Sequence, residues 1–385
     1  MRRIMSVILA AILFLDVVCL GVLFFTRDSK PEEGGTGEEL FSRASIVAVG
    51  NNMISEQILS QAAARSNTGG YDFTAVYENV ADDIESADLA LITQESVISS
   101  EHSVSGTYPL YNAPAEIADA FIKTGFDYVN LATNHALDYG EQGLVNTINL
   151  LKNEKHLGVL GAVADKGQAG EPVFRRVNGI KIGFVAFTDP DNDKSLPEDS
   201  EAFLMISQYE DMIYDAVTSA KQQADFVIAL PHWGNEYGSE VTQAQRTLAK
   251  KLGDWGADAV IGTNPHELQE IEYISNTDGS RTLVAYSLGN FFSSQEKGEL
   301  LLGGMLRFEI VRNTRSGEVT LENVSLSGVV THYGIGTSKV RLYKLSDYTD
   351  ELADVHGVDR KRTPGFGVKY LKKLLAERIS SEFLR

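Results

Sequence analysis

Short apolar runs alternate along this chain with segments of helical character. The apolar runs have the length of buried strands, and they lie at 45–50, 88–92, 127–131, 225–230 and 258–261. The segments between them carry helical periodicity or helix-boundary residues, and they lie at 56–64, 73–86, 114–125, 141–152 and 242–255. Alternating strands and helices predict an α/β fold.

Hairpin signals accumulate in the second half of the chain. Asn178-Gly179 is a strong turn signal between two predicted strands, and Asn276 to Gly279 separates a second pair. These strands are predicted at 173–177, 180–187, 268–274 and 282–286, with later ones at 304–311 and 319–330. We therefore expect a mixed sheet, or two packed sheets, flanked by helices.

The N-terminus predicts a membrane anchor. Arg2 and Arg3 precede an apolar run from Ile4 to Phe25. The run is long enough to span a bilayer, and the two arginines favour a cytoplasmic N-terminus. A cleaved signal peptide is the alternative, although no small-residue cleavage site follows the run. The predicted organisation is an anchor at 1–26, a flexible acidic linker at 27–44, an extracytoplasmic domain at 45–345 and a helical C-terminal segment at 346–385.

Charge and cysteine content exclude several classes of partner. The 385-residue chain has 34 Lys and Arg against 53 Asp and Glu, a formal charge of −19. Such an acidic protein is unsuited to nucleic acid, which requires a basic face. It also disfavours broad docking of a polyanion such as polyglutamate. Cys19 is the single cysteine and lies in the N-terminal apolar run, so an internal disulfide is excluded.

Polar residues that could bind metal follow the ends of the predicted strands. They are Asn51, Glu95, Asn134, His232, Asn264 and His266. In open α/β sheets such ends gather at one edge, where ligands bind. Oxygen and imidazole donors suit Zn, Mn or Fe, and two such ions can hold a phosphate and activate water. Glu95 is the one acid at these ends suited to bridge two ions.

Further residues near the same ends are candidates for catalysis or substrate contact. His135 could act as an acid or clamp a phosphate, and Asp138 could fix its tautomer or merely cap the next helix. Trp233, Glu236 and Asn290 are candidates for substrate binding. Trp233 could equally pack in the cleft wall, and Asn290 could close a sheet end.

Four motifs resemble the CapA family. They are Ala132-Thr-Asn-His-Ala-Leu-Asp-Tyr-Gly140, Pro231-His-Trp-Gly-Asn-Glu-Tyr237, Gly256 to Gly262 with Pro265-His266, and Tyr286-Ser-Leu-Gly-Asn-Phe291. The resemblance extends from about Ser45 to Phe292. It implies a calcineurin-like metallophosphoesterase fold, with two packed β-sheets between helical layers. It also implies a membrane-anchored role in poly-γ-glutamate capsule synthesis.

Several positions depart from the family pattern. Asn51 stands where the family has Asp, Ser55 and Thr93 replace a histidine and an asparagine, and Asn264 replaces a histidine, while Glu95 is kept. Neutral amides bind transition metals less well than carboxylate or imidazole. We therefore expect at most one weakly held divalent ion (Mn, Zn or Fe).

Three functions are consistent with this substituted site. The first is a cleft that binds a cell-envelope polymer, or a capsule synthesis complex at the cytoplasmic membrane, without turnover. The second is an active metal-dependent phosphoesterase or hydrolase that acts on an envelope polymer. The third is a scaffold for a membrane synthase, acting through the anchor and the outer faces.

Overall fold

The computed structural model describes residues 40–67, 69–190 and 194–385. Leu40–Arg385 forms one compact unit. The predicted anchor, and the linker up to residue 39, lie outside the described residues. None of the helices in the described part of the chain is long and apolar enough to cross a membrane.

A large sheet is built around a long first strand. Its order is β19-β18-β17-β1-β2-β6-β7, and β16 also pairs with β1. The strands are β1 (Phe41–Asn52), β2 (Leu89–Gln94), β6 (Tyr128–Asn130), β7 (Gly158–Leu160), β16 (Asn290–Phe292), β17 (Leu302–Asn313), β18 (Val319–Gly334) and β19 (Ser338–Lys344). Strands β1, β2, β6 and β7 run parallel, whereas β17 to β19 are antiparallel.

A second sheet has the order β14-β15-β13-β12-β10-β9. Its strands are β9 (Val173–Val177), β10 (Ile180–Thr188), β12 (Phe226–His232), β13 (Ala259–Ile261), β14 (Ile271–Ser275) and β15 (Arg281–Ala285). The four central strands are parallel, and the two edge strands are added by hairpins. The Asn178-Gly179 turn between β9 and β10 has φ values of 48° and 83°, as that dipeptide predicts.

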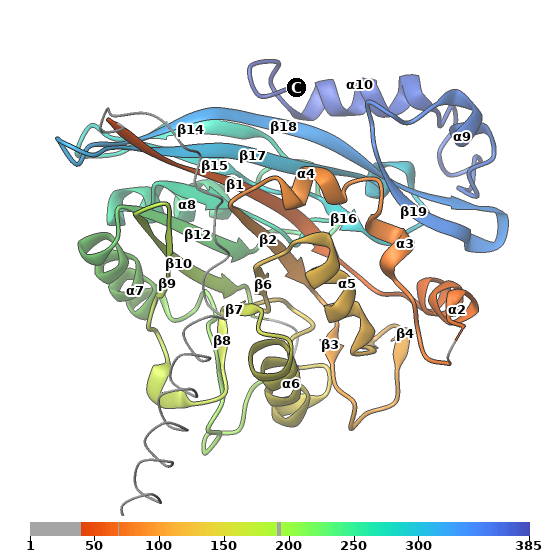
Figure 1. Cartoon of the computed structure of the whole chain (residues 1–385), viewed down its shortest axis with the longest axis horizontal. Coiled ribbons are helices and arrows are strands. Elements are labelled where there is room, and N and C mark those ends of the chain that lie inside the picture. The colour runs from red at the N-terminus through yellow and green to blue at the C-terminus, as the bar shows by residue number, and fades with distance from the viewer. Residues whose placement is uncertain (1–39, 68, 191–193) are drawn as a thin grey trace, which may run out of the picture. The chain divides into compact units, whose positions relative to one another are not determined.

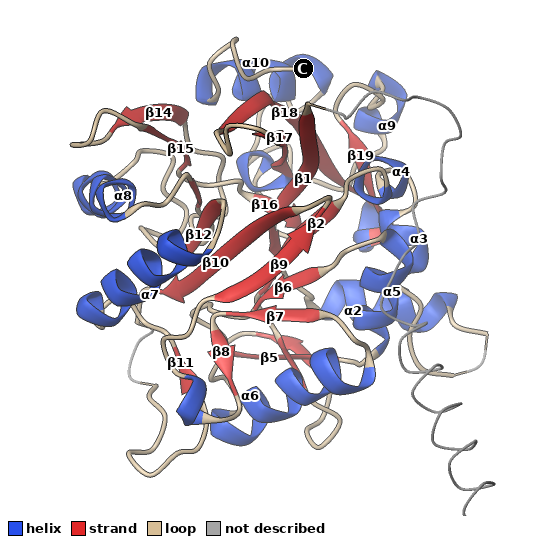
Figure 2. Cartoon of the chain, turned by 60° about the vertical axis from the view of Figure 1, so that its left-hand side comes forward, coloured by secondary structure: helices blue, strands red, loops and turns tan. Residues whose placement is uncertain are grey.

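Alternating side chains along the strands create the layers of the molecule. Ile46 of β1 and Ile228 of β12 belong to one buried cluster, which lies between the two sheets. Their neighbours in sequence point the other way. Val47 packs with the helices on the first sheet, and Val227 with those on the second. The fold is therefore mixed α/β, with two packed sheets between helical layers (Figures 1 and 2).

Helices cover the outer faces of both sheets, and two more helices lie in the C-terminal segment. The first sheet is covered by α2 (Glu56–Arg65), α3 (Thr74–Tyr77), α4 (Ala81–Glu85), α5 (Glu116–Thr124) and α6 (Gly140–Asn149), which ends in a π-helical turn at Leu150–Glu154. The second is covered by α7 (Glu210–Gln223) and α8 (Gln243–Trp255). The C-terminal segment contains α9 (Asp350–Asp354) and α10 (Val368–Arg378).

Several predicted boundaries differ from the observed ones. Strand β1 begins at Phe41, because its pairing with β17 continues to Phe41 opposite Asn313. Strand β12 runs past Pro231, because Pro231 stays in register with β10 and its carbonyl accepts a hydrogen bond from the Thr263 amide (3.0 Å). The helix predicted at 73–86 is two short helices, α3 and α4.

Candidate functional site

The structure brings the predicted strand-end residues together across the two sheets. The Nδ2 atom of Asn51, at the end of β1, lies 3.1 Å from Nδ1 of His266. His266 Nδ1 in turn lies 3.8 Å from Glu95 Oε1. On the other side of the site, His232 Nε2 at the end of β12 lies 3.1 Å from Asn134 Oδ1. Residues separated by up to 215 positions in sequence thus form one cluster.

His232 is held at both ring nitrogens. Its Nδ1 lies 2.9 Å from the Thr263 hydroxyl, and its Nε2 faces Asn134 Oδ1. The amide of Asn134 then donates to Glu236 Oε1 (2.8 Å). Burial, and then the nearby His266 and His135, lower the pKa of His232 well below its usual value. A neutral imidazole has one donor and one acceptor, so both capacities of His232 are met inside the protein.

Asn290 holds His266 and does not face the cleft. Its Oδ1 lies 2.9 Å from His266 Nδ1, and its Nδ2 donates to Gln295 Oε1 (2.7 Å) and the Leu300 carbonyl (3.0 Å). Only 1% of Asn290 is exposed. Of the two roles considered for Asn290, closing a sheet end is the one that these internal hydrogen bonds support. Burial also lowers the pKa of His266 to about 4, so this imidazole is neutral.

Glu95 is buried, and neither of its carboxylate oxygens has a hydrogen-bond partner. The buried Oδ1 atom of Asn51 also has none. Burial raises the pKa of Glu95 to about 8, with His135 opposing the shift and Glu236 adding to it. A buried carboxylate is stable only when it is protonated or neutralised by a cation. Glu95 therefore carries a proton at neutral pH unless a cation is bound.

The cluster contains few of the side chains that usually bind a metal ion. Among the residues that the structure describes, no group of three or more His, Cys, Asp or Glu side chains is placed to hold a metal ion. The oxygens of Glu95 and Asn51 have no hydrogen-bond partner, and both residues lie near Nδ1 of His266. A carboxylate, an amide oxygen and an imidazole fit one ion of the Mn, Zn or Fe type.

His135 and Asp138 form a separate pair at the same edge. His135 Nδ1 donates to Asp138 Oδ2 (3.0 Å), and Asp138 also accepts from the Tyr111 amide (2.8 Å) and from Lys194. The residue before α6 is Tyr139, which makes no side-chain cap. Of the two roles open to Asp138, orienting the imidazole is the one that its contacts support. Burial opposes the charged form of His135, but Asp138 and Glu95 raise its pKa.

Trp233 belongs to the core. It is 1% exposed, its Nε1 donates to the Tyr286 carbonyl (2.9 Å), and its ring lies in the buried cluster between the second sheet and its helices. Of the two roles considered for Trp233, packing in the wall is the one that its contacts support, because the side chain lies in the helix layer of the second sheet. Glu236 is exposed beside the cleft.

Two of the family departures have clear structural roles. Asn264, with φ of 98°, donates its amide to the Gly234 carbonyl (2.8 Å) and so ties its loop to the one after β12. Ser55 hydrogen-bonds to the Ser294 hydroxyl. Together with Asn134, His232 and Glu236, Asn264 lines a cleft of about 160 Å³.

Four further residues shape the site and were not predicted from the sequence. Tyr111 meets the His135 ring edge to face (4.9 Å), and Tyr237 stacks on His266 (5.3 Å). Asp189 accepts from the Gly234 amide (3.0 Å), and Lys194 reaches Asp138. Asp189 directly follows β10, so the strand-end rule would have found it. Tyr237 ends the second of the family motifs, whereas nothing in the local sequence marks Tyr111 or Lys194.

Comparison with known proteins assigns the chain to a family. The fold and the site define a mixed α/β protein with a cleft of imidazoles and amides at its strand ends. A family model described as bacterial capsule synthesis protein PGA_cap matches residues 45–295. The chain belongs to this family, the CapA family.

Curated relatives support the same assignment. The chain is 32% identical over 206 residues to the PGA biosynthesis protein CapA of Bacillus subtilis (strain 168), covering 51% of this chain and 50% of that protein. It is 32% identical over 188 residues to the capsule biosynthesis protein CapA of Bacillus anthracis, covering 48% and 44%. The chain thus spans about half the length of these relatives. Among solved structures, the NAD nucleotidase (NadN) of Haemophilus influenzae is similar at TM-score 0.48 and 14% identity, covering 88% of this chain and 61% of that one.

Proposed function

We propose that this chain acts in the synthesis of a capsule, of poly-γ-glutamate or of another cell-envelope polymer, and that its cleft binds without turnover. The ligand is the polymer itself or a partner in the synthesis complex. Membership of the family supports the general role. The single observation that carries the absence of turnover is the pairing of His232 with Asn134, which occupies the imidazole nitrogen facing the cleft.

The cation proposed for this site is one weakly held divalent ion. Glu95, Asn51 and His266 would hold it, and it would supply charge that neutralises the buried carboxylate. Metal affinity falls when carboxylate or imidazole ligands are replaced by amides, as at Asn51 and Asn264. The affinity is therefore lower than in a site with the family's full ligand set.

The proposed location is the outer side of the cytoplasmic membrane. The support is the apolar run Ile4–Phe25 after Arg2 and Arg3, which suits a single-pass anchor with a cytoplasmic N-terminus. An acidic ectodomain would remain in solution beside an anionic membrane surface. The linker at 27–44 would then control its access to a growing polymer.

A second candidate function is hydrolysis of a phosphoester or polymer bond. The observation that favours it is the intact pair of His135 and Asp138, since a histidine oriented by a carboxylate is suited to general acid catalysis. In this alternative His135 protonates a leaving group, and Asp138 and Lys194 maintain its orientation.

Complementation separates the two functions. The full-length chain and its variants are expressed in a capsule-forming bacterium that lacks its own family member, and capsule polymer is quantified. The binding function predicts that His135→Gln keeps polymer production, whereas Glu236→Arg, which fills the mouth of the cleft with an opposite charge, abolishes it. Loss of the polymer in His135→Gln, with Glu236→Arg unaffected, would establish the hydrolytic alternative.

A further inference from the structure

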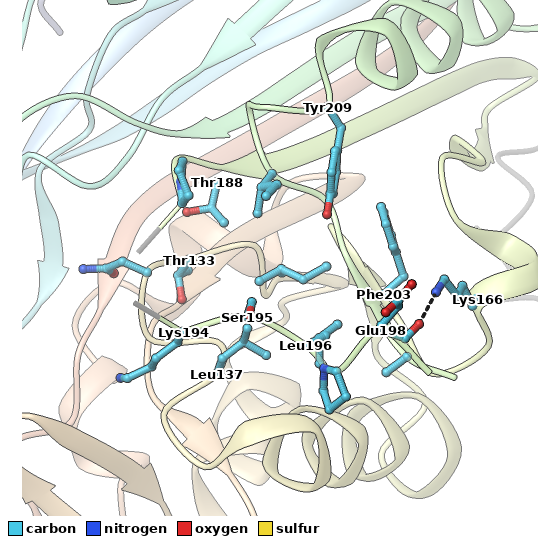
Figure 3. A pocket seen from close by; sticks show the side chains of 16 residues that line it. Thr133, Leu137, Lys166, Thr188, Lys194, Ser195, Leu196, Glu198, Phe203 and Tyr209 are labelled. Atoms are coloured by element: carbon cyan, nitrogen blue, oxygen red, sulfur yellow. Dashed lines mark hydrogen bonds between the residues drawn. The ribbon is translucent and has the colours of Figure 1, made fainter. Parts of the chain in front are cut away.

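A second and larger cavity, of about 300 Å³, adjoins the polar cleft. The two share the residues Asn134, Thr188 and Pro190. Figure 3 shows Thr133 and Thr188 on the same side of this cavity as Lys194. Because these three residues line both spaces, the larger cavity is a direct neighbour of the polar cleft.

The walls of the larger cavity are mainly apolar. They include Leu137 after β6, Leu196 from the loop after β10, and Phe203 and Leu204 of the short strand β11 (Phe203–Leu204). An apolar cavity of this size lies at the lower end of the range for small-molecule sites, roughly 300–1,000 Å³. Such walls exclude water and recognise hydrocarbon.

Two lysines stand at opposite sides of the cavity. Lys194 contacts the buried Asp138 carboxylate on the side of the cleft, and Lys166 donates to the Glu198 carbonyl (3.1 Å) on the far side (Figure 3). Among the described residues that line either cavity, these two are the cations. An anionic group held near Lys194 would therefore place an attached apolar group between the leucines.

We propose that this cavity binds the hydrocarbon part of an amphipathic anion, whose phosphate or carboxylate headgroup lies beside Lys194 where the cavity meets the polar cleft. This inference goes beyond the proposed function, because the ligand of the larger cavity, a hydrocarbon-bearing anion, is distinct from the polymer or partner proposed for the polar cleft. The source of this anion is either a membrane lipid or a free metabolite.

The first test is isothermal titration of the full-length chain, in phosphatidylcholine nanodiscs, with butyl, hexyl and octyl phosphate below their micelle concentrations. Affinity is expected to rise about fourfold for each added methylene. Octanol, which lacks the charge, is expected to bind roughly tenfold more weakly than octyl phosphate or worse. Affinity that does not depend on chain length would overturn the proposal.

Variants locate the site. Leu196→Trp fills the cavity and should abolish binding of octyl phosphate, while Leu352→Trp, a change at a partly buried leucine of α9 away from the cavity, should leave it intact. Lys194→Met should reduce the affinity for octyl phosphate to that for octanol and leave octanol binding unchanged. Equal affinities for octyl phosphate in the wild type, Leu196→Trp and Lys194→Met would refute the site.

The source of the ligand follows from a second arm with nanodiscs that contain phosphatidic acid. If the lipid occupies the cavity, octyl phosphate binding is lost in these discs and is restored when phosphatidic acid is omitted. If binding persists, the ligand is a free amphipathic anion. The readout is binding and not polymer production, so failure here leaves the proposed function standing, and failure of the complementation experiment leaves this site standing.

Discussion

The imidazole of His135 donates to the carboxylate of Asp138 across 3.0 Å, within a single turn of chain that begins beside a candidate metal ligand, Asn134. The Asp138 side chain is fully buried, and it also accepts from the Tyr111 amide and from Lys194. One carboxylate thereby joins three separate parts of the chain: the loop after β6, the strand β5 (Leu110–Ala113) and the loop after β10.

Removing the charge of Asp138 should destabilise the protein. Asp138→Asn retains the shape but weakens the hydrogen bonds with His135 and Lys194, and bonds to charged groups contribute about 1.5–3 kcal/mol each. We expect the free energy of unfolding, measured by urea denaturation, to fall by about this amount or more. The control is Asp119→Asn, since Asp119 pairs with Lys155 at an exposed site and such pairs contribute about 1 kcal/mol or less. Equal losses in the two variants would contradict the role given to Asp138.

Trp233 should behave as a core residue. Trp233→Ala leaves a large cavity between the second sheet and its helices and removes the hydrogen bond to Tyr286. The expected loss of unfolding free energy is about 3–5 kcal/mol. Trp255→Ala, at the other tryptophan of the chain, which is only partly buried, should cost less. A Trp233→Ala variant with wild-type stability and impaired ligand binding would contradict the core role and indicate that Trp233 contacts the ligand.

The stability of the C-terminal segment should depend on pH. His332 and His356 are buried 5.2 Å apart, and burial lowers the pKa of each from 6.5 to about 4. His356 Nε2 donates to the Thr331 carbonyl (3.1 Å), while Nδ1 accepts from the Val358 amide (2.9 Å). A second proton on His356 would make Nδ1 a donor, and it would then face the N–H of Val358, which is also a donor.

The free energy of unfolding should fall as the pH falls. Between pH 6.5 and about 4 the two histidines are protonated in the unfolded chain but neutral in the folded chain. Their contribution to stability is therefore fully present above pH 6.5 and is lost as the pH drops through this window. Urea denaturation at several pH values should show this decline, and His356→Gln should make it shallower. An identical slope in the variant would show that His356 does not contribute.

Strand periodicity was sufficient to predict where the polar cluster would form. Apolar runs of strand length determine which residues follow the strand ends, so Asn51, Glu95, Asn134, His232 and His266 were expected to meet. The two hairpins and the alternation of helices could be predicted for the same reason, because their turn and boundary residues are local signals.

The roles of individual side chains could not be predicted, since they depend on pairings between distant segments. Asn290 reaches His266 only because β16 pairs with β1, which places Asn290 opposite Asn51. Trp233 turns into the core because β12 continues past Pro231. Lys194 lies in a loop without periodicity, so its contact with Asp138 has no sequence signal.

The most direct test of the central claim, that amides have weakened this metal site, is a measurement of metal content and affinity. The purified full-length chain is equilibrated with Zn²⁺ or Mn²⁺, and bound metal is quantified by mass spectrometry and calorimetry, beside the variant Asn51→Asp. We predict at most one weakly bound ion in the wild type and at least a roughly tenfold gain in affinity in the variant, which supplies a stronger ligand. Two tightly bound ions in the wild type, with no gain in the variant, would contradict the account.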